Sequence, residues 1–274
     1  MKLQDKFIEL RNKRQGILAT NFYNFETLEG VLCAAKSTDQ PLILQLTRSS
    51  IDYIGLPVAF NLAKTMLDYH GVEGWIHLDH GNSYKLVAQC LDVGFDSVMI
   101  DASEQSFKDN IAITSKVVKL AESYGANVEA ELGYIAKLGQ DKDGNGLTRP
   151  EEAKEFVEAT GVDALAVAIG TAHGFYDKEP KLDLERLSEI NRSTGATLVL
   201  HGGSGIPAES LRQAVDRGIC KINLATEIKN IFMQTLKTKL ATNEEIDLRK
   251  VFPVATNQIV ELVKGKLEIV RNVK

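Results

Sequence analysis

The segment L-A-V-A-I-G-T-A-H-G at residues 165–174 is the stretch that decides the fold. Its first five residues are apolar without alternation, which is typical of a strand buried on both faces in a parallel sheet. Comparable short runs recur along the chain, separated by longer amphipathic stretches. The sequence predicts eight strands, at Ile17–Asn21, Leu42–Thr47, Trp75–Asp79, Ser97–Asp101, Asn127–Leu132, Leu165–Ile169, Thr197–Leu200 and Lys221–Leu224.

The amphipathic stretches between these strands carry helix signals at their ends. Gly94 and Gly125 follow last turns, and Pro57 and Pro150 lie near first turns. Besides a short charged helix at the start of the chain, we predict helices at Glu26–Ser37, Val58–Tyr69, Tyr84–Val93, Asn110–Tyr124, Pro150–Thr160, Leu184–Thr194 and Ala208–Arg217. Repeated strand-then-helix units indicate an α/β protein with the (β/α)8 TIM-barrel fold, as a single domain over residues 1–274.

Composition argues against several classes of partner. The net charge is -5 and no basic stripe stands out, so we expect no nucleic-acid partner. No apolar run approaches the ~18 residues of a membrane span, and the first residues lack the apolar core of a signal peptide. Cys33, Cys90 and Cys220 are scattered and form no C-x-x-C pair, which favours reduced thiols in a cytoplasmic protein.

Three of the five histidines lie where a predicted strand ends: His80 in W-I-H-L-D-H-G, His173 in A-I-G-T-A-H-G and His201 in L-V-L-H-G-G-S-G. Each is followed at once by glycine, which lets backbone or a ligand come close. Three neutral imidazoles with one open position are a known plan for a catalytic zinc site. A lone histidine is more often a core residue, but three copies at strand ends favour metal ligation.

Three carboxylates accompany these histidines. Asp79 directly precedes His80 and is a candidate general acid/base beside a metal-bound substrate, the alternative being a carboxylate that orients a ligand imidazole. Asp101 and Glu131 also end strands. They could bind a second or displaced metal, or equally hold inward-facing hydrogen bonds.

Two loops have the character of a phosphate site. H-G-G-S-G at 201–205 opens the helix near Pro207, and N-L-A-T-E at 223–227 follows the last predicted strand. Small residues before a helix N-terminus expose N–H groups to an anion. Because the loops after strands seven and eight are the usual phosphate site of a TIM barrel, the two segments together predict a phosphorylated substrate.

These residues resemble the class II, zinc-dependent fructose/tagatose-bisphosphate aldolases, and the tagatose-type branch is nearest. The resemblance spans nearly the whole chain, and H-L-D-H-G at 77–81 fits the family's H-x-D-H-G signature. The other similar blocks are A-T-N-F-Y-N-F-E-T at 19–27, D-S-V-M-I-D-A-S at 96–103, V-E-A-E-L-G at 128–133, A-V-A-I-G-T-A-H-G at 166–174, L-V-L-H-G-G-S-G at 198–205 and K-I-N-L-A-T-E at 221–227.

The resemblance implies a role for each matching residue. His80, His173 and His201 would hold zinc, Asp79 would exchange the proton of the substrate's C4 hydroxyl, and Asp101 and Glu131 match positions linked to an alternative metal site. A monovalent cation near the phosphate is a further expectation. The candidate substrate-binding residues are Asn21, Thr47, Arg48, Gly174, Gly202, Gly203, Ser204, Asn223, Ala225 and Thr226.

Two loops depart from the family. Where relatives carry a mobile G-G-x-E-D loop whose glutamate moves the C3 proton, this chain reads Y-I-A-K-L-G-Q-D at 134–141, and Asp141 or Asp143 could substitute. In L-T-R-S-S at 46–50, Thr47 keeps the family's hydroxyl but Arg48 is unusual. A guanidinium there suits an anionic distal group on the sugar, unless it is a solvated surface arginine.

The sequence therefore predicts an aldolase that cleaves a ketose 1-phosphate or 1,6-bisphosphate to dihydroxyacetone phosphate and an aldehyde, in a homodimer or homotetramer. Cleavage of C3–C4 leaves an enediolate, whose charge zinc stabilises as a Lewis acid. One alternative is a metal-dependent hydrolase, against which the two phosphate loops argue. The others are a catalytically altered sugar-phosphate-binding relative, and an aldolase for a non-standard sugar with another anionic distal group.

Overall fold

The computed structural model of the chain describes residues 1–133, 135, 146–176 and 179–272. Eight parallel strands close into a barrel in chain order, so that β1 pairs with both β2 and β8. The predicted (β/α)8 TIM barrel is therefore confirmed. The strands are β1 (Ile17–Asn21), β2 (Leu42–Thr47), β3 (Gly74–Gly81), β4 (Ser97–Ile100), β5 (Asn127–Leu132), β6 (Ala164–Val167), β7 (Thr197–Leu200) and β8 (Ile219–Leu224).

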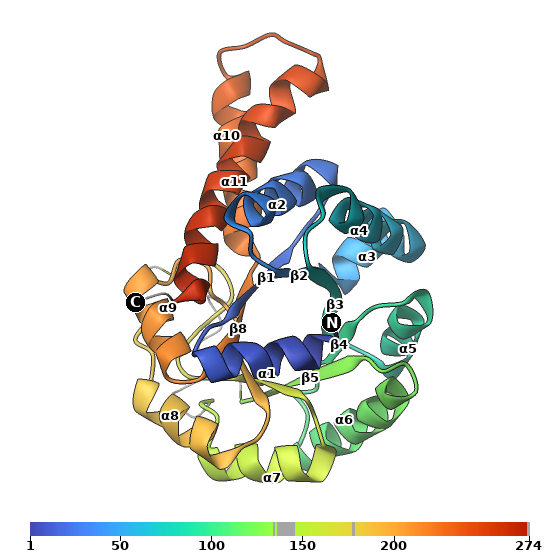
Figure 1. Cartoon of the computed structure of the whole chain (residues 1–274), viewed down its shortest axis with the longest axis vertical. Coiled ribbons are helices and arrows are strands. Elements are labelled where there is room, and N and C mark those ends of the chain that lie inside the picture. Colours follow the sequence, from blue (N-terminus) through green and yellow to red (C-terminus); the bar gives the residue numbers. More distant parts are fainter. Residues whose placement is uncertain (134, 136–145, 177–178, 273–274) are drawn as a thin grey trace.

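A ring of helices covers the outside of this barrel (Figure 1). The ring comprises α2 (Phe25–Thr38), α4 (Leu56–His70), α5 (Tyr84–Val93), α6 (Phe107–Glu122), α7 (Pro150–Thr160), α8 (Leu184–Ser193) and α9 (Ala208–Asp216). Each helix in this list was predicted to within three residues at either end. No helix in the described part of the chain is both long enough and apolar enough to cross a membrane.

The two faces of the strands bury different residues. Outward-facing Ile76 and Leu78 of β3 belong to the large core between strands and helices. Inward-facing Trp75 belongs to a smaller cluster that also contains Leu3 and Phe7 of α1 (Leu3–Lys13). Helix α1 thus packs onto the starts of the strands and lies across that opening of the barrel (Figure 1).

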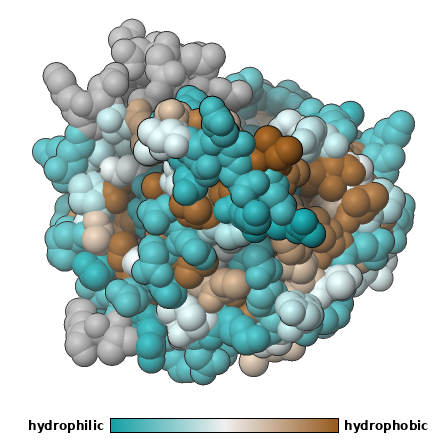
Figure 2. Space-filling view, turned by 90° about the horizontal axis from the view of Figure 1, so that it is seen from above, coloured by the Kyte–Doolittle hydropathy of each residue, from teal (hydrophilic) through white to brown (hydrophobic). Residues whose placement is uncertain are grey.

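Three elements were not predicted. Helix α3 (Arg48–Ile54) begins where a loop was expected, because the Thr47 side chain accepts a hydrogen bond from the Ser50 backbone and caps a helix directly after β2. Helices α10 (Thr226–Leu240) and α11 (Leu248–Arg271) form a hairpin that projects beyond the barrel (Figure 1). Figure 2, seen from that end, shows hydrophobic surface beside hydrophilic residues, and Leu240, Ile246 and Leu248 of the hairpin are exposed.

The base of this hairpin packs closely on α2. A Cβ atom added at Gly30 of α2 would lie 2.8 Å from the Cβ of Ile259 and 2.9 Å from the carbonyl oxygen of Thr256, both on α11. Gly30 therefore sets the distance between the two helices.

We expect Gly30→Ala to destabilise the protein by about 1–3 kcal/mol, because the extra methyl group overpacks this contact. The matched control is Gly265→Ala on α11, where an added Cβ meets nothing within 4 Å. That exchange should stabilise the helix by about 0.5–1 kcal/mol, since alanine is the better helix former. Denaturant unfolding of both variants checks this, and a stabilising Gly30→Ala would contradict the packing argument.

Candidate active site

A cavity of about 680 Å³ lies at the carboxyl ends of the strands. Asp79 and His80 of β3 line it together with His173, which follows β6. The other predicted residues that line it are Asn21, Thr47, Asp101, Glu131, Gly174, Gly202, Ser204, Asn223, Ala225 and Thr226. His201 is fully buried but contacts the rings of His80 and His173.

The three histidines converge although they come from three different strands. The ring centroids of His80 and His201 are 4.8 Å apart, those of His80 and His173 5.0 Å, and those of His173 and His201 5.9 Å. Each ring offers one nitrogen such that the three atoms lie within 4.8 Å of one another. This spacing allows one ion to contact all three rings.

The backbone at His80 explains how two consecutive residues can line one cavity. Successive side chains of a regular strand point to opposite faces. His80 has a φ of +50°, and the pairing of β3 with β4 shifts register between Leu78 and Gly81. A left-handed non-glycine residue costs about 1–3 kcal/mol, so strain is stored where the site is built. Gly81 is required here, because a Cβ atom would strike the carbonyl oxygen of Met99.

Asp79 is held by two amides at the floor of the cavity. Asn21 Nδ2 donates to its Oδ2 at 2.9 Å, and Asn223 Nδ2 donates to its Oδ1 at 3.3 Å. Burial alone would raise the pKa of Asp79, but His80, His201 and Lys221 lower it below its usual value. The carboxylate is therefore ionised and can accept a proton from a bound molecule.

Two of the histidines are oriented by carboxylates. His80 Nδ1 lies 2.7 Å from Asp101 Oδ2, which leaves His80 Nε2 on the side of Asp79. His201 Nε2 lies 2.8 Å from Glu129 Oε1, which leaves His201 Nδ1 on the side of Glu131. A carboxylate that fixes an imidazole in this manner is typical of metal sites.

Two buried atoms beside the trio support a fit to a cation. His201 Nδ1 and Glu131 Oε2 are buried without a hydrogen-bond partner among the described residues, and they lie 3.2 Å apart. Burial lowers the pKa of His201, but the carboxylates of Glu129 and Glu131 beside its two nitrogens outweigh it and raise the pKa to about 10. The cluster thus attracts positive charge, which either a proton or a metal ion can supply. Asp101 and Glu131 also form a second possible ligand group with His80.

The two predicted phosphate loops meet at the same cavity. Gly202 has a φ of +68°, and a Cβ there would strike the carbonyl oxygen of Ala172, so only glycine fits between the loops. The hydroxyl of Tyr176 accepts from the Ala172 backbone at 2.7 Å and lies 2.9 Å from the Gly202 carbonyl oxygen. Tyr176, which sequence reasoning did not identify, therefore ties together the loops that carry His173 and His201.

Arg48 is not brought into the cavity. It is the first residue of α3, it is half-exposed, and its Nε pairs with both oxygens of Asp52 at 2.7 Å. Its neighbour Ser49 lines the cavity instead. Gly203 is not among the lining residues either. The unusual 134–141 segment, apart from Ile135, lies outside the described residues, as do Asp141 and Asp143.

Several lining residues were missed by the sequence reasoning. Lys229 is one turn into α10, and its Nζ lies 5.4 Å from the ring centroid of Tyr23. The outer wall carries Ser49, Asn82, Ser103, Glu104 and Gln105. The signal for Lys229 was its position three residues after Thr226, which places both on one helix face.

Charged groups continue beneath the trio, inside the barrel. Lys221 Nζ lies 2.7 Å from Glu129 Oε2, and both side chains have 1% exposure or less. His77 is equally buried, and burial together with the charge of Lys221 lowers its pKa to about 3. The sequence signal was alternation: in N-V-E-A-E-L and K-I-N-L every second residue is polar.

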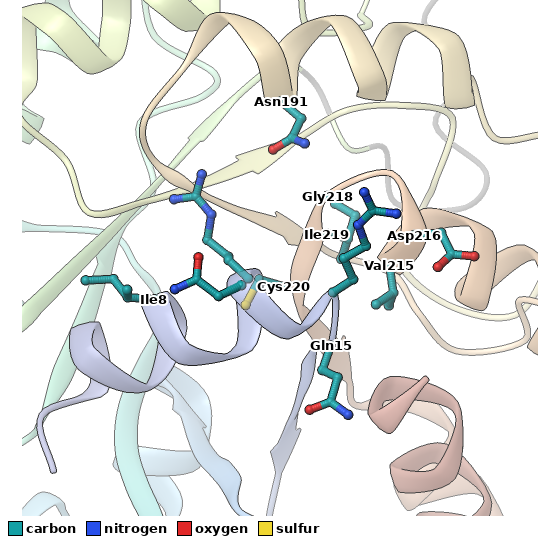
Figure 3. Close-up of a pocket in the computed structure, with 11 residues that line it drawn as sticks. Ile8, Gln15, Asn191, Val215, Asp216, Gly218, Ile219 and Cys220 are labelled. Carbon is teal, nitrogen blue, oxygen red and sulfur yellow. The ribbon is translucent and has the colours of Figure 1, made fainter. Parts of the chain in front are cut away.

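A separate pocket of about 450 Å³ lies at the opposite end of the barrel (Figure 3). Arg11 of α1, Asn191 of α8 and Cys220 of β8 are among the residues that line it. Its described lining contains no histidine, so it offers no counterpart of the trio.

Comparison with known proteins gives one consistent family. The family model described as "Fructose-bisphosphate aldolase class-II" matches residues 1–274. A fructose-bisphosphate aldolase of Helicobacter pylori is 36% identical, with 98% of this chain and 97% of the relative covered. One of Staphylococcus aureus is also 36% identical, over 98% and 96%. The crystal structure of the YdjI aldolase from Escherichia coli K12 superposes with a TM-score of 0.88 at 30% identity, over 98% of this chain and 96% of that one.

The buried histidines predict how stability depends on pH in the metal-free protein. The pKa values of His77 and His173 are lowered from 6.5 to about 3, mainly by burial. His201, whose pKa is raised, stays protonated in the folded protein, so below about pH 6 its contribution to stability is complete and constant. From about pH 6 down to about pH 5 the unfolded chain therefore binds protons at His77 and His173 that the folded chain does not, and stability falls as the pH falls. In His77→Gln, which keeps only His173, this dependence should be about half as steep. Denaturant unfolding in the presence of a chelator, repeated across this range, measures it, and an unchanged slope would contradict a neutral His77.

Proposed function

This chain belongs to the class II fructose-bisphosphate aldolase family, and from that membership we propose that it is a zinc-dependent aldolase acting on a ketose 1-phosphate or 1,6-bisphosphate. The products would be dihydroxyacetone phosphate and an aldehyde. The observation that carries the proposal is the convergence of three strand-end histidines beside Asp79, in a cavity whose far wall is made of two small-residue loops.

The metal ligands in this proposal are His80, His173 and His201. The orphaned His201 Nδ1 and the cation-attracting carboxylates around it support the assignment. A bound zinc ion would supply Lewis-acid stabilisation of the negative charge that develops on the ketone half during C3–C4 cleavage. Asp101 holds His80 and Glu129 holds His201, so both rings are oriented before anything binds.

Asp79 is the proposed base for the C4 hydroxyl. Its lowered pKa keeps it ionised, and the amides of Asn21 and Asn223 fix the carboxylate without neutralising it. When the C3–C4 bond breaks, the hydroxyl proton passes to Asp79 and the hydroxyl carbon becomes the aldehyde. The electron pair stays on the dihydroxyacetone phosphate half, whose C3 must then be protonated by an acid or by water.

The phosphate would bind where Gly174, Gly202 and Ser204 meet the start of α10. Ala225 and Thr226 stand at the helix N-terminus, where the helix dipole favours an anion. Lys229 lines the same cavity and adds a positive charge one turn further on. The aldehyde half would then face the outer wall of Ser49, Ser103 and Gln105. Arg48 gives no support to an anionic distal group, because it pairs with Asp52 outside the cavity.

We further propose a homo-oligomer in the cytoplasm. The projecting α10–α11 hairpin supports oligomerisation, because it exposes Leu240, Ile246 and Leu248 on an element that only its base holds to the barrel. Free thiols at Cys33, Cys90 and Cys220 suit a reducing compartment.

The experiment that tests the proposed function is direct. Purified protein is incubated with dihydroxyacetone phosphate and a panel of charged and uncharged aldehydes, and the products are identified. Formation of a ketose phosphate with at least one aldehyde is the expected result. Failure with every aldehyde, by protein that carries its metal, would reject aldolase function.

We expect one catalytic zinc per chain, which His173→Ala and His201→Ala should each remove together with activity. Metal analysis of the folded variants provides the measurement. The control is His70→Ala, because Glu29, Cys33 and His70 form a further possible ligand group away from the cavity. Full zinc occupancy and activity in either site variant would refute the assignment.

Asp79→Ala should keep its zinc but lose about 10²- to 10⁴-fold in the rate of cleavage, as is usual for a general acid–base group. This role concerns only the C4 hydroxyl of the sugar. Hydrogen exchange at the hydroxymethyl carbon of dihydroxyacetone phosphate, which is C3 of the sugar, should therefore survive in the variant. Turnover and deuterium exchange measured side by side separate the two steps. Undiminished turnover would mean that Asp79 only orients His80.

A further inference from the structure

A line of polar side chains runs through the barrel from α1 to His201. Its members lie on α1, β5, β4, β3 and β8 and in the loop after β7, and most of them are fully buried. In spatial order they are Gln4, Asn127, Ser97, His77, Lys221, Glu129 and His201. Burying these polar groups costs desolvation energy, so each donor in the line must meet an acceptor.

The lower half of the line fixes the tautomer of His77. Asn127 Nδ2 donates to Gln4 Oε1 at 2.8 Å, which leaves Asn127 Oδ1 as an acceptor for Ser97 Oγ at 3.4 Å. A serine hydroxyl has a single hydrogen. Ser97 Oγ must therefore accept from His77 Nδ1, which lies 2.8 Å away, and the hydrogen of a neutral His77 is on Nδ1.

The ammonium group of Lys221 connects the two halves. His77 Nε2, left without a hydrogen, accepts from Lys221 Nζ at 3.4 Å, and Glu129 Oε2 accepts from it at 2.7 Å. With the Gln45 amide donating to the Ala19 carbonyl oxygen, Gln45 Oε1 accepts from Lys221 at 3.2 Å. The three hydrogens of the ammonium group thus have three acceptors.

The upper half fixes His201. Glu129 is an acceptor at both oxygens, and its Oε1 lies 2.8 Å from His201 Nε2. His201 Nε2 must therefore carry a hydrogen. An ion can therefore bind His201 only through Nδ1, in place of the second ring proton, and this atom lies beside His80 and His173.

We propose that Glu129, held as an ionised acceptor at both oxygens by the ammonium group of Lys221, is a positioning residue for the metal site, so that His201 presents Nδ1 to the ion. The proposal rests on the proposed metal-dependent function. Lys221 keeps Glu129 an acceptor on both sides, because its positive charge is buried against that carboxylate. His80 is held in the opposite sense, with Nδ1 taken by Asp101 and Nε2 left for the ion.

The first test is spectroscopic and uses the zinc-loaded protein. Long-range nitrogen–proton correlations of ¹⁵N-histidine report which ring nitrogen carries hydrogen and which binds metal. We expect His201 to bind through Nδ1 with hydrogen on Nε2, and His77 to carry hydrogen on Nδ1 alone. Coordination through His201 Nε2, or hydrogen on His77 Nε2, would overturn the proposal.

The second test measures zinc affinity by competition with a chelator. Glu129→Gln offers one acceptor where two are needed, so the dissociation constant for zinc should rise about 10- to 100-fold. The matched control is Glu122→Gln on the exposed surface of α6, which should bind zinc as the parent does. Parent-like zinc affinity in folded Glu129→Gln would overturn the proposal.

Should Glu129→Gln fail to fold, the spectroscopic test on the parent protein still decides the proposal. These outcomes are separate from the proposed function, which fails only if the parent protein lacks zinc or aldolase activity.

Discussion

Closure of the sheet is the constraint on which the rest of this protein depends. A parallel strand needs a partner at both edges, and pairing β1 with β8 satisfies all eight strands at once. Closure brings the carboxyl ends of distant strands to one rim, which is how His80, His173 and His201 meet. It also makes the interior so narrow that every inward-facing side chain must contact others.

Because side chains alternate between the two faces of a strand, every second residue points into the barrel, and these inward residues form layers. On β3, Trp75 joins the apolar floor, His77 lies in the buried polar line, and Asp79 reaches the cavity. Polar groups become acceptable in the middle layer only because each finds a partner, as Lys221 does in Glu129. The cavity residues at the rim thus lie above a buried polar layer, and that layer lies above an apolar one.

Sequence reasoning predicted the strands well because buried apolar runs such as Leu198–Leu200 have a strong local signal. It predicted that His80, His173 and His201 lie at one end of the barrel, and they converge there because strand ends meet in any such barrel. It did not predict helix α3, capped by Thr47, and Arg48 at the start of that helix lies on the surface, which was one of the two readings left open for it. It also missed the middle layer. Alternation in β5 and β8 is normally a sign of a solvated face, whereas here the polar residues Glu129 and Lys221 point into the barrel. The left-handed turn at His80 depends on cross-strand register, which no local pattern contains.

The apolar floor has a consequence for the order in which this protein is made. Helix α1 precedes every strand in the chain, yet its hydrophobic face belongs to a cluster that includes residues of β6, β7 and β8 as well as of β1, β2 and β3. Cys220 and Phe7, which touch through Sγ and a carbonyl oxygen, are 213 residues apart. During synthesis this first helix cannot bury its whole apolar side until nearly the entire barrel has left the ribosome. The nascent chain therefore carries a partly uncovered apolar helix through most of its synthesis.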